Sequence, residues 1–228
     1  MTPPVPPDVA AIEAELRGRH RVTTSDVRIA ADETLAIVHP ANADDLITEA
    51  DYVRDERLPY WADIWPSAVV LARFLRGLAG TGRTLLELGC GSGVVASAAA
   101  RAGFDVTATD YYDDAPMFAR VNAWHAAHVD IAARHADWSA WPAELTGFDL
   151  VVASDVLYEH RYSDMVARVL AMALGRHGEG WIADPGRVGA DGFRTRCAEL
   201  ALGCEAIARV PIEAGAHVHT VTLWRITR

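Results

Sequence analysis

The sequence predicts an α/β fold with a mostly parallel sheet that helices cover on both faces. From residue 84 onward, short apolar segments typical of strands alternate with longer segments of helical periodicity. This alternation is characteristic of parallel strands joined by crossover helices. The last two strand-like segments are joined by a tight connection, which indicates an antiparallel strand at the edge of the sheet.

The composition is that of a globular chain. Its 228 residues are 51% hydrophobic and 23% charged, which is enough to bury a core without disulfides. No run of about 18 apolar residues occurs, so we expect no transmembrane span and no membrane partner. The proline-rich start, residues 1–7, lacks the pattern of a signal peptide and is interpreted as a short flexible lead.

The net charge and the cysteines indicate which kinds of ligand and of metal or disulfide site to expect. The formal net charge is −10; an acidic surface repels phosphate backbones, which argues against nucleic acid, and favours a cationic substrate. Cys90, Cys197 and Cys204 show no paired close spacing, so we expect reduced thiols in a cytoplasmic protein. His125 and His128 are interpreted as solvated helix surface, since no acid or cysteine completes a metal cluster.

The first 59 residues are expected to form an extension that covers the core of a domain spanning residues 60–228, both within one structural unit. The pattern of apolar residues in this extension predicts a helix over residues 10–19 and two short strands over 27–30 and 34–38. Residues 42–55 are polar and acidic, which predicts a loop or short helix over the core.

The remaining segments predict alternating helices and strands. An apolar stripe after Trp65-Pro66 predicts a helix over 67–78, which Gly80-Thr81-Gly82 ends. The predicted strands are 84–88, 105–109, 131–135, 148–153, 180–183, 205–211 and 217–226. The predicted helices are 94–101, 115–128, 162–174 and 189–202.

A glycine-rich turn joins the first of these strands to its helix. It carries Gly89, Gly91 and Gly93, and glycines allow the backbone to turn sharply and a ligand to lie against it. Asp110 ends the next strand about 20 residues further on, the spacing at which an acid accepts hydrogen bonds from ribose hydroxyls. The order of strand, turn, helix, strand and acid predicts a ligand site of the nucleotide-binding type.

Glu87, two places before the first glycine, bears on which ligand binds. An acid there would repel a pyrophosphate but can pair with the ammonium of an amino acid, directly or through a water. The segment 87–93 resembles motif I of S-adenosylmethionine-dependent methyltransferases. The resemblance implies a Rossmann-like fold with a seven-stranded sheet, S-adenosyl-L-methionine as the cofactor, Glu87 and the three glycines in its site, and Asp110 holding the ribose.

Asp137-Trp138 follows the third predicted strand. It resembles the position that reads the adenine, through a carboxylate to the amino group and through ring contact. Core or surface packing is the alternative interpretation of Trp138. We also count Trp65 and Ser154 among the candidate cofactor-binding residues.

Asp155 and Tyr158 follow a strongly apolar strand, and the carboxyl ends of parallel strands are where ligands bind. Their Asp-x-x-Tyr spacing resembles the signature of the seven-strand protein-lysine methyltransferases. The resemblance implies that both lie beside the methyl acceptor, and we take them as candidate catalytic residues: Asp155 would anchor the incoming ammonium, and Tyr158 would wall its channel. A helix-capping aspartate and a packed tyrosine are the alternative.

Three further stretches resemble the lysine methyltransferases of the electron-transfer-flavoprotein beta subunit. They are Pro-Tyr-Trp-Ala-Asp-Ile-Trp-Pro at 59–66, Trp-Ile-Ala-Asp-Pro-Gly-Arg at 181–187 and Thr-Val-Thr-Leu-Trp at 220–224. Arg187 in the second stretch either lines the acceptor site or holds a loop. The chain departs from the family at Ser154 and Leu157, where a glycine or an aromatic residue is frequent.

The resemblance implies methylation of a lysine side chain on a protein substrate, by a cytoplasmic enzyme that acts as a monomer. Two alternatives stay open. A small-molecule amine or N-heterocycle methyltransferase would form a deep closed pocket around residues 61–63, where a protein-directed enzyme would form an open groove. A non-catalytic module would bind S-adenosylmethionine and recruit a partner.

Overall fold

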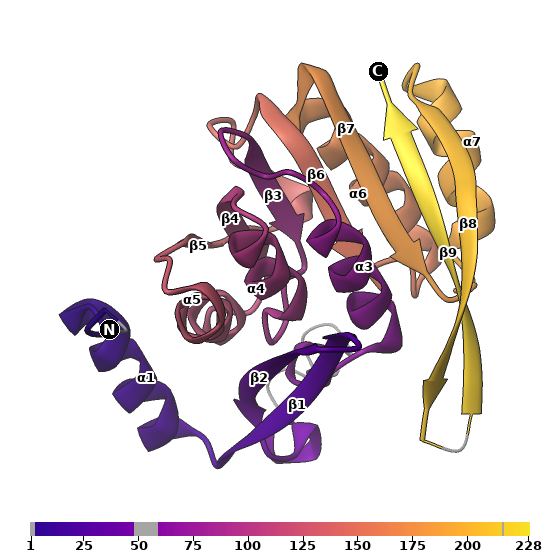
Figure 1. Cartoon of the computed structure of the whole chain (residues 1–228). Coiled ribbons are helices and arrows are strands. Elements are labelled where there is room, and N and C mark those ends of the chain that lie inside the picture. The colour runs from indigo at the N-terminus through magenta and orange to yellow at the C-terminus, as the bar shows by residue number, and fades with distance from the viewer. Residues whose placement is uncertain (1–2, 48–58, 216) are drawn as a thin grey trace.

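The protein folds around a seven-stranded sheet with the strand order β5-β4-β3-β6-β7-β9-β8 (Figure 1). The structure, a computed structural model, describes residues 3–47, 59–215 and 217–228. The strands of this sheet are β3 (Thr84–Leu88), β4 (Asp105–Asp110), β5 (Ala132–His135), β6 (Phe148–Ser154), β7 (Leu174–Asp184), β8 (Gly203–Ala214) and β9 (His217–Thr227). β3 to β7 pair in parallel and β9 pairs antiparallel with both β7 and β8, so the predicted fold class is confirmed.

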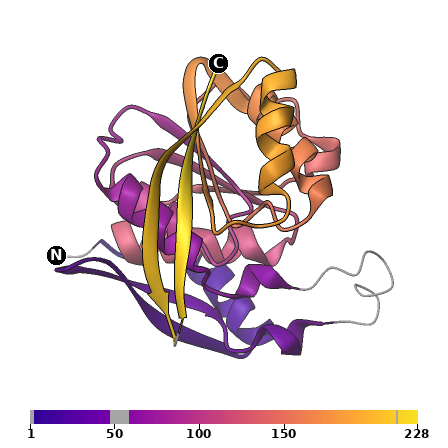
Figure 2. The same ribbon diagram turned by 90° about the vertical axis from the view of Figure 1, so that its right-hand side faces the viewer.

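Helices cover both faces of the sheet (Figures 1 and 2). One face carries α3 (Pro66–Arg76), α4 (Val94–Arg101) and α5 (Asp114–Ala127), with α1 (Pro7–Arg19) packed on α5. The other carries α6 (His160–Ala173) and α7 (Ala190–Glu199). Short 3-10 helices lie in the connections of the described residues: η1 (Ala43–Leu46), η2 (Tyr60–Ala62) and η3 (Trp138–Ala140).

The central strands β3 and β6 carry apolar residues on both of their faces because both faces are buried. On β3, Leu85 packs against the α3–α5 side and Leu86 against the α6–α7 side. On β6, Val152 packs against the α3–α5 side and Val151 against the α6–α7 side. Since successive side chains of a strand point to opposite faces, a continuous apolar run is what a sheet between two helix layers requires.

The N-terminal part adds a two-stranded hairpin of β1 (Val22–Ala30) and β2 (Glu33–Pro40). Ile29 and Ile37 are buried against Ala72 of α3 and Val94 of α4. The predicted strands 27–30 and 34–38 lie within this hairpin, and η1 lies within the loop or short helix predicted over 42–55. Residues 48–55 of that prediction lie outside the described residues.

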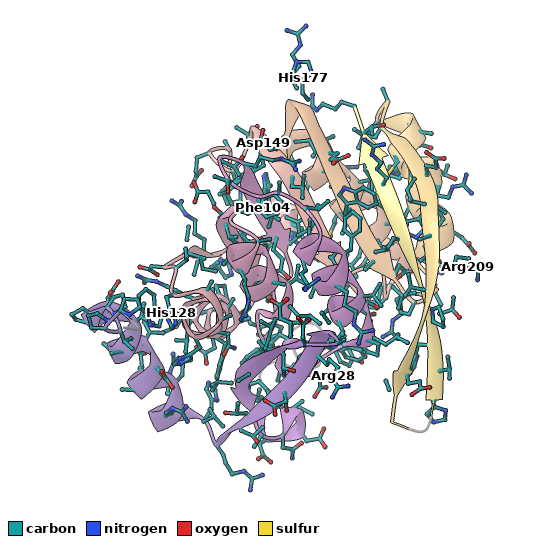
Figure 3. The ribbon with its side chains drawn as sticks, in the orientation of Figure 1. Arg28, Phe104, His128, Asp149, His177 and Arg209 are labelled. Carbon is teal, nitrogen blue, oxygen red and sulfur yellow. The ribbon has the colours of Figure 1, made fainter. Side chains whose placement is uncertain are left out.

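The strand order locates the edge where a ligand binds. The chain runs from β3 outward through β4 and β5, then crosses back to β6 on the other side of β3. Ligands of open α/β sheets bind at the carboxyl ends of the strands, at this point of reversal. Figure 3 places Asp149, near the start of β6, at the upper end of the sheet and Arg28 of the hairpin below its lower end. The lower end is therefore the carboxyl edge.

Within the described ranges, no helix has the length and apolar character needed to cross a bilayer.

Candidate active site

The turn after β3 depends on glycine at two positions for different reasons. Gly91 has φ +49°, and a Cβ there would lie 2.9 Å from the carbonyl oxygen of Trp61. Gly93 has φ +81°, and a Cβ there would lie 2.3 Å from the Cα of Ala119. Left-handed backbone favours glycine. Gly91 thus lets the turn pass beneath η2, and Gly93 lets α4 pack closely on α5.

Asp110, at the end of β4, is bound to this turn. Its Oδ2 accepts a hydrogen bond from the N–H of Gly91 at 3.0 Å, and its Oδ1 accepts one from the N–H of Tyr112 at 3.1 Å. Burial raises the pKa of the carboxyl, and these N–H groups oppose that rise. A carboxylate has about four acceptor positions, so Asp110 keeps the capacity to accept further bonds from a ligand.

Glu87 lies behind the turn rather than on its open side. Its side chain is buried, and its Oε2 has no hydrogen-bond partner among the described residues. Burial holds the pKa of its carboxyl well above the ordinary value, and the nearby charge of Asp110 adds to the rise. Neither Glu87 nor Gly93 lines the cavity in front of the turn.

That cavity, at the carboxyl edge of the sheet, gathers nine of the eleven residues that the sequence singled out. They are Trp65, Gly89, Gly91, Asp110, Asp137, Trp138, Ser154, Asp155 and Tyr158. Among the described residues that line it, the charged side chains are four aspartates, Asp63, Asp110, Asp137 and Asp155, and no arginine or histidine is present. Four carboxylates in a lining that contains no cationic side chain make a cavity that attracts cationic ligands.

At one end of the cavity stand Asp137 and Trp138. Asp137 accepts hydrogen bonds at its Oδ1 from the N–H and Oγ of Ser139, at 2.8 and 2.7 Å, and so caps η3. The ring of Trp138 meets that of Tyr162 nearly edge-on, with centroids 5.7 Å apart. Tyr162 is buried, and its hydroxyl has no hydrogen-bond partner among the described residues. The sequence did not single out Tyr162, because it lies in an ordinary helical pattern.

A row of five aromatic rings lines the cavity from this end to the other. The row runs Trp138, Tyr162, Tyr158, Tyr60 and Trp65. The successive centroids are 5.7, 4.6, 5.8 and 5.9 Å apart. Aromatic faces attract cations, so these rings reinforce the preference that the aspartates give the cavity.

Asp155 lies at the other end, directly after β6. Its φ is +59°, a strained value for a residue with a side chain, and its N–H donates to the carbonyl of Ala183 at 2.9 Å. The carboxylate is 6% exposed; Oδ2 accepts from the hydroxyl of Ser67 at 3.1 Å and Oδ1 from Nε of Arg187 at 2.6 Å. Ser67 is a second site residue that no pattern in the sequence indicates.

The Asp-Pro-Gly-Arg turn after β7 directs Arg187 to this place. The Oδ2 of Asp184 accepts hydrogen bonds from the N–H groups of Gly186 and Arg187, at 2.7 and 3.2 Å. The guanidinium carbon of Arg187 lies 5.2 Å from the ring centroid of Trp65. The arginine therefore lies between a carboxylate and an aromatic face.

No metal centre accompanies the site within the described part of the chain, where no three His, Cys, Asp or Glu side chains are grouped to hold an ion. The cavity instead combines a glycine turn and Asp110 on one side with Asp155 and aromatic rings at its other end. It can hold an extended, positively charged ligand beside a second cation.

Comparison with solved structures supports the fold. The structure is similar to a 16S rRNA N2 G1207 methyltransferase of Thermus thermophilus, solved with AdoMet and guanosine, with TM-score 0.59, 15% identity and coverage of 90% of this chain and 50% of that one. It is also similar to the ribosomal protein L11 methylase of Lactobacillus delbrueckii, with TM-score 0.53, 23% identity and coverage of 71% and 77%.

Two curated proteins are similar in sequence. The electron transfer flavoprotein beta subunit lysine methyltransferase of Danio rerio is 33% identical over 135 residues, covering 57% of this chain and 51% of that protein. Protein N-lysine methyltransferase METTL21A of Xenopus tropicalis is 29% identical over 119 residues, covering 49% and 55%. The chain spans about half the length of the curated relatives it matches.

The family described as lysine methyltransferase matches residues 52–183. This segment is more than half of the 228 residues, and it includes the glycine turn, Asp110, Asp137 and Asp155. The chain belongs to the lysine methyltransferase family.

Proposed function

We propose that the protein transfers a methyl group from S-adenosylmethionine to a lysine side chain of a protein substrate. The observation that carries this proposal is the cavity lined by four aspartates and eight aromatic residues, with no cationic side chain among its described lining residues. Both ligands of such an enzyme are positively charged where they meet, as a sulfonium and as a lysine ammonium. Membership of the lysine methyltransferase family supports the same conclusion.

The residues present fit S-adenosylmethionine. Asp110 would accept the ribose hydroxyls with its remaining lone pairs, and Asp137, Trp138 and the unpaired hydroxyl of Tyr162 would meet the adenine. Glu87 lies behind the turn and would reach the ammonium of the amino-acid part through a water. When bound, S-adenosylmethionine supplies an electrophilic methyl group on a positively charged sulfur.

At the acceptor end, Asp155 would orient the lysine amine and Tyr158 would wall its path. A lysine has a reference pKa of about 10.4, so it arrives as an ammonium and must lose a proton before it can attack. Positioning the neutral amine in line with the methyl group is the main contribution that this chain can make. Tyr60 and Asp63, which line the cavity, are both exposed, which supports an open groove for a protein side chain rather than a closed pocket.

The experiment that tests this function incubates the purified protein with S-adenosylmethionine tritiated in its methyl group and a size-separated cell lysate. The sequence contains no lysine, since all 21 of its basic residues are arginine. Label on a lysine side chain therefore belongs to another protein and not to this chain. We expect label in a discrete protein band.

Two matched variants make the experiment specific. Asp155→Asn removes the charge, and asparagine tolerates the left-handed backbone of this position; we expect retained S-adenosylmethionine affinity and turnover at least about 100-fold lower. Asp164→Asn makes the same change on α6 outside the cavity, where Asp164 pairs with Arg168 and with Arg196 of α7, and we expect wild-type turnover. Equal turnover of wild type and Asp155→Asn would remove Asp155 from the mechanism.

Two other outcomes would replace the proposal. Label in the small-molecule fraction alone would assign the protein to small amines or N-heterocycles. Binding of S-adenosylmethionine without transfer to any component would assign it to the non-catalytic modules.

We further propose that the protein works in the cytoplasm, as a monomer, and without nucleic acid as its partner. The net charge of −10 supports the last point. Three unpaired cysteines, of which Cys90 and Cys197 are buried, support a reducing compartment. Light scattering on the protein as it elutes from a size-exclusion column would contradict the monomer if the mass were twice 24.7 kDa or a higher multiple.

A further inference from the structure

The acceptor end of the cavity contains an ion pair to which no role has been assigned. Arg187 donates its Nε to Asp155 at 2.6 Å, and its side chain is 36% exposed whereas that of Asp155 is 6% exposed. The pair is held from both sides. Ser67 of α3 fixes the other oxygen of Asp155, and Asp184 fixes the backbone of Arg187.

The charges around Asp155 are otherwise negative. Asp184 at the end of β7 is buried, its Oδ1 has no hydrogen-bond partner among the described residues, and burial together with the charge of Asp155 raises the pKa of its carboxyl. Asp63, between η2 and α3, lines the same cavity. Ser67, the contact from α3, is neutral. Arg187 is thus the cation that the described structure places on Asp155.

This balance of charges matters for an acceptor that must give up a proton. A carboxylate beside an ammonium raises the pKa of that ammonium and so holds its proton in place. Asp155, which the proposed function uses to orient the amine, would by itself work against the reaction. A guanidinium stays charged throughout the physiological range, and one that touches the carboxylate offsets this effect without removing the hydrogen-bond acceptor.

We propose that Arg187 is a positioning residue for methyl transfer: it holds the Asp155 carboxylate in place and offsets its charge, so that a bound lysine ammonium releases its proton more readily. The N–H bond breaks, its electron pair stays on nitrogen as the attacking lone pair, and the proton passes to solvent water. The exposed rim at Tyr60 and Asp63 leaves a path for that water. This role rests on the proposed function.

The first test measures cation binding and needs no turnover. The probe is N-acetyl-lysine methylamide at pH 7, where its side-chain amine is protonated, added to protein saturated with S-adenosylhomocysteine and followed by NMR. Arg187→Gln removes the competing cation, and we expect the probe to bind about fivefold more tightly. In an Asp155→Asn background, the same Arg187→Gln change should leave the probe affinity unaltered, because Arg187 acts through Asp155.

The second test measures methyl transfer to poly-L-lysine as a function of pH. Since the amine must be neutral to attack, kcat at saturating poly-L-lysine rises as pH passes through the pKa of the bound amine. Arg187→Gln should move this rise upward by about one pH unit. The loss at pH 7 should be about tenfold and should largely recover at high pH.

Arg194→Gln is the matched control. Arg194 on α7 also lies over a tryptophan ring, 5.6 Å from the centroid of Trp224, and it is outside the cavity. The variant makes the same change of charge and should match the wild type in both tests.

The outcomes separate the two claims. A lower or unchanged cation affinity in Arg187→Gln, or a loss of turnover that is equal at every pH, would reduce Arg187 to a residue that holds its loop and would overturn the inference. A wild-type protein that methylates no acceptor would contradict the proposed function. The cation affinities would then still decide, without turnover, whether Arg187 offsets the charge of Asp155.

Discussion

At the scale of a single residue, the buried carboxyl of Glu87 lowers the stability of the native state. An unpaired carboxylate oxygen buried beneath the glycine turn weakens the native state, because burial disfavours the charged form. A glutamine of the same shape would fill the space without a charge. We propose that this carboxyl is kept for cofactor binding at the expense of stability, as at many functional sites.

Glu87→Gln should stabilise the ligand-free protein in a pH-dependent way. The folded-state pKa of Glu87 is raised, so the wild type loses stability as pH rises from about 4.3, the unfolded value, toward the folded value. Glutamine does not titrate, and we expect Tm to rise by about 2–4 °C at pH 8 and to be unchanged at pH 4. Calorimetry at both pH values checks this.

Glu144→Gln is the matched control, since the Glu144 side chain is 66% exposed; its Tm should stay that of the wild type at both pH values. A gain in Glu87→Gln that is as large at pH 4 as at pH 8 would show that the charge of Glu87 is not the cause.

Tyr162→Phe should weaken cofactor binding while leaving the fold intact. The buried hydroxyl lacks a partner among the described residues, and a hydrogen bond to the adenine would satisfy it. Its loss should raise the Kd for S-adenosylhomocysteine about tenfold, measured by titration calorimetry. Tyr158→Phe, the same change at the acceptor end, should leave this Kd unaltered, and equal Kd values for the two variants would contradict the assignment.

The sequence predicted the motif residues of the site but not their polar partners. Glycines and acids placed at strand ends have a recognisable order, and nine of these side chains do line one cavity. Ser67 and Tyr162 lie inside helices, where a serine or a tyrosine has no distinctive pattern. Their proximity to Asp155 and Trp138 arises only when α3 and α6 pack against the sheet.

At the scale of elements, the N-terminal hairpin contributes buried residues to the hydrophobic core and is not a peripheral addition. Ile37 of β2 is fully buried among residues of β1, α3 and α4. The hairpin lies below the carboxyl edge of the sheet (Figure 1), and η2 follows it in the chain and lines the cavity. We therefore propose that residues 1–59 and 60–228 unfold as one unit.

Ile37→Ala tests this coupling. Loss of the buried side chain should reduce the free energy of unfolding by about 2–4 kcal/mol. All seven tryptophans lie at or beyond residue 61, so their fluorescence reports urea unfolding outside the hairpin. The tryptophan transition should move to lower urea as one step, while Thr34→Ala on the exposed face of β2 should leave it in place.

A tryptophan transition unaffected by Ile37→Ala would mean that the hairpin unfolds separately.

Element boundaries were harder to predict than element types. β1 begins at Val22, five residues before the predicted strand, because Thr23 to Asp26 are polar and lack apolar alternation. β7 begins at Leu174 rather than at 180, since Gly175 and Gly178 interrupt its apolar run. For β1, pairing with β2 supplies the regular structure that the local sequence does not indicate. For β7, the early part pairs with β6 at Leu174 and Glu179, with an irregularity between them.

At the scale of the whole molecule, negative charge is common to the chain as a whole and to its cavity. The chain carries a net charge of −10 and no lysine, and its cavity concentrates aspartates beside aromatic rings. A cationic protein segment would be drawn to such a molecule, and the attraction would fall as salt screens it. The absence of lysine also means that the chain offers no lysine side chain of its own as a methyl acceptor.

The most direct measurement is the identity of the methylated residue. Protein labelled from tritiated S-adenosylmethionine in the lysate is hydrolysed to amino acids, and the label is separated by chromatography. We predict that the label elutes with N-methylated lysine and that Asp155→Asn removes it. Label that elutes with methylated arginine or histidine, or that never enters protein, would contradict the assignment of this cavity to a lysine acceptor.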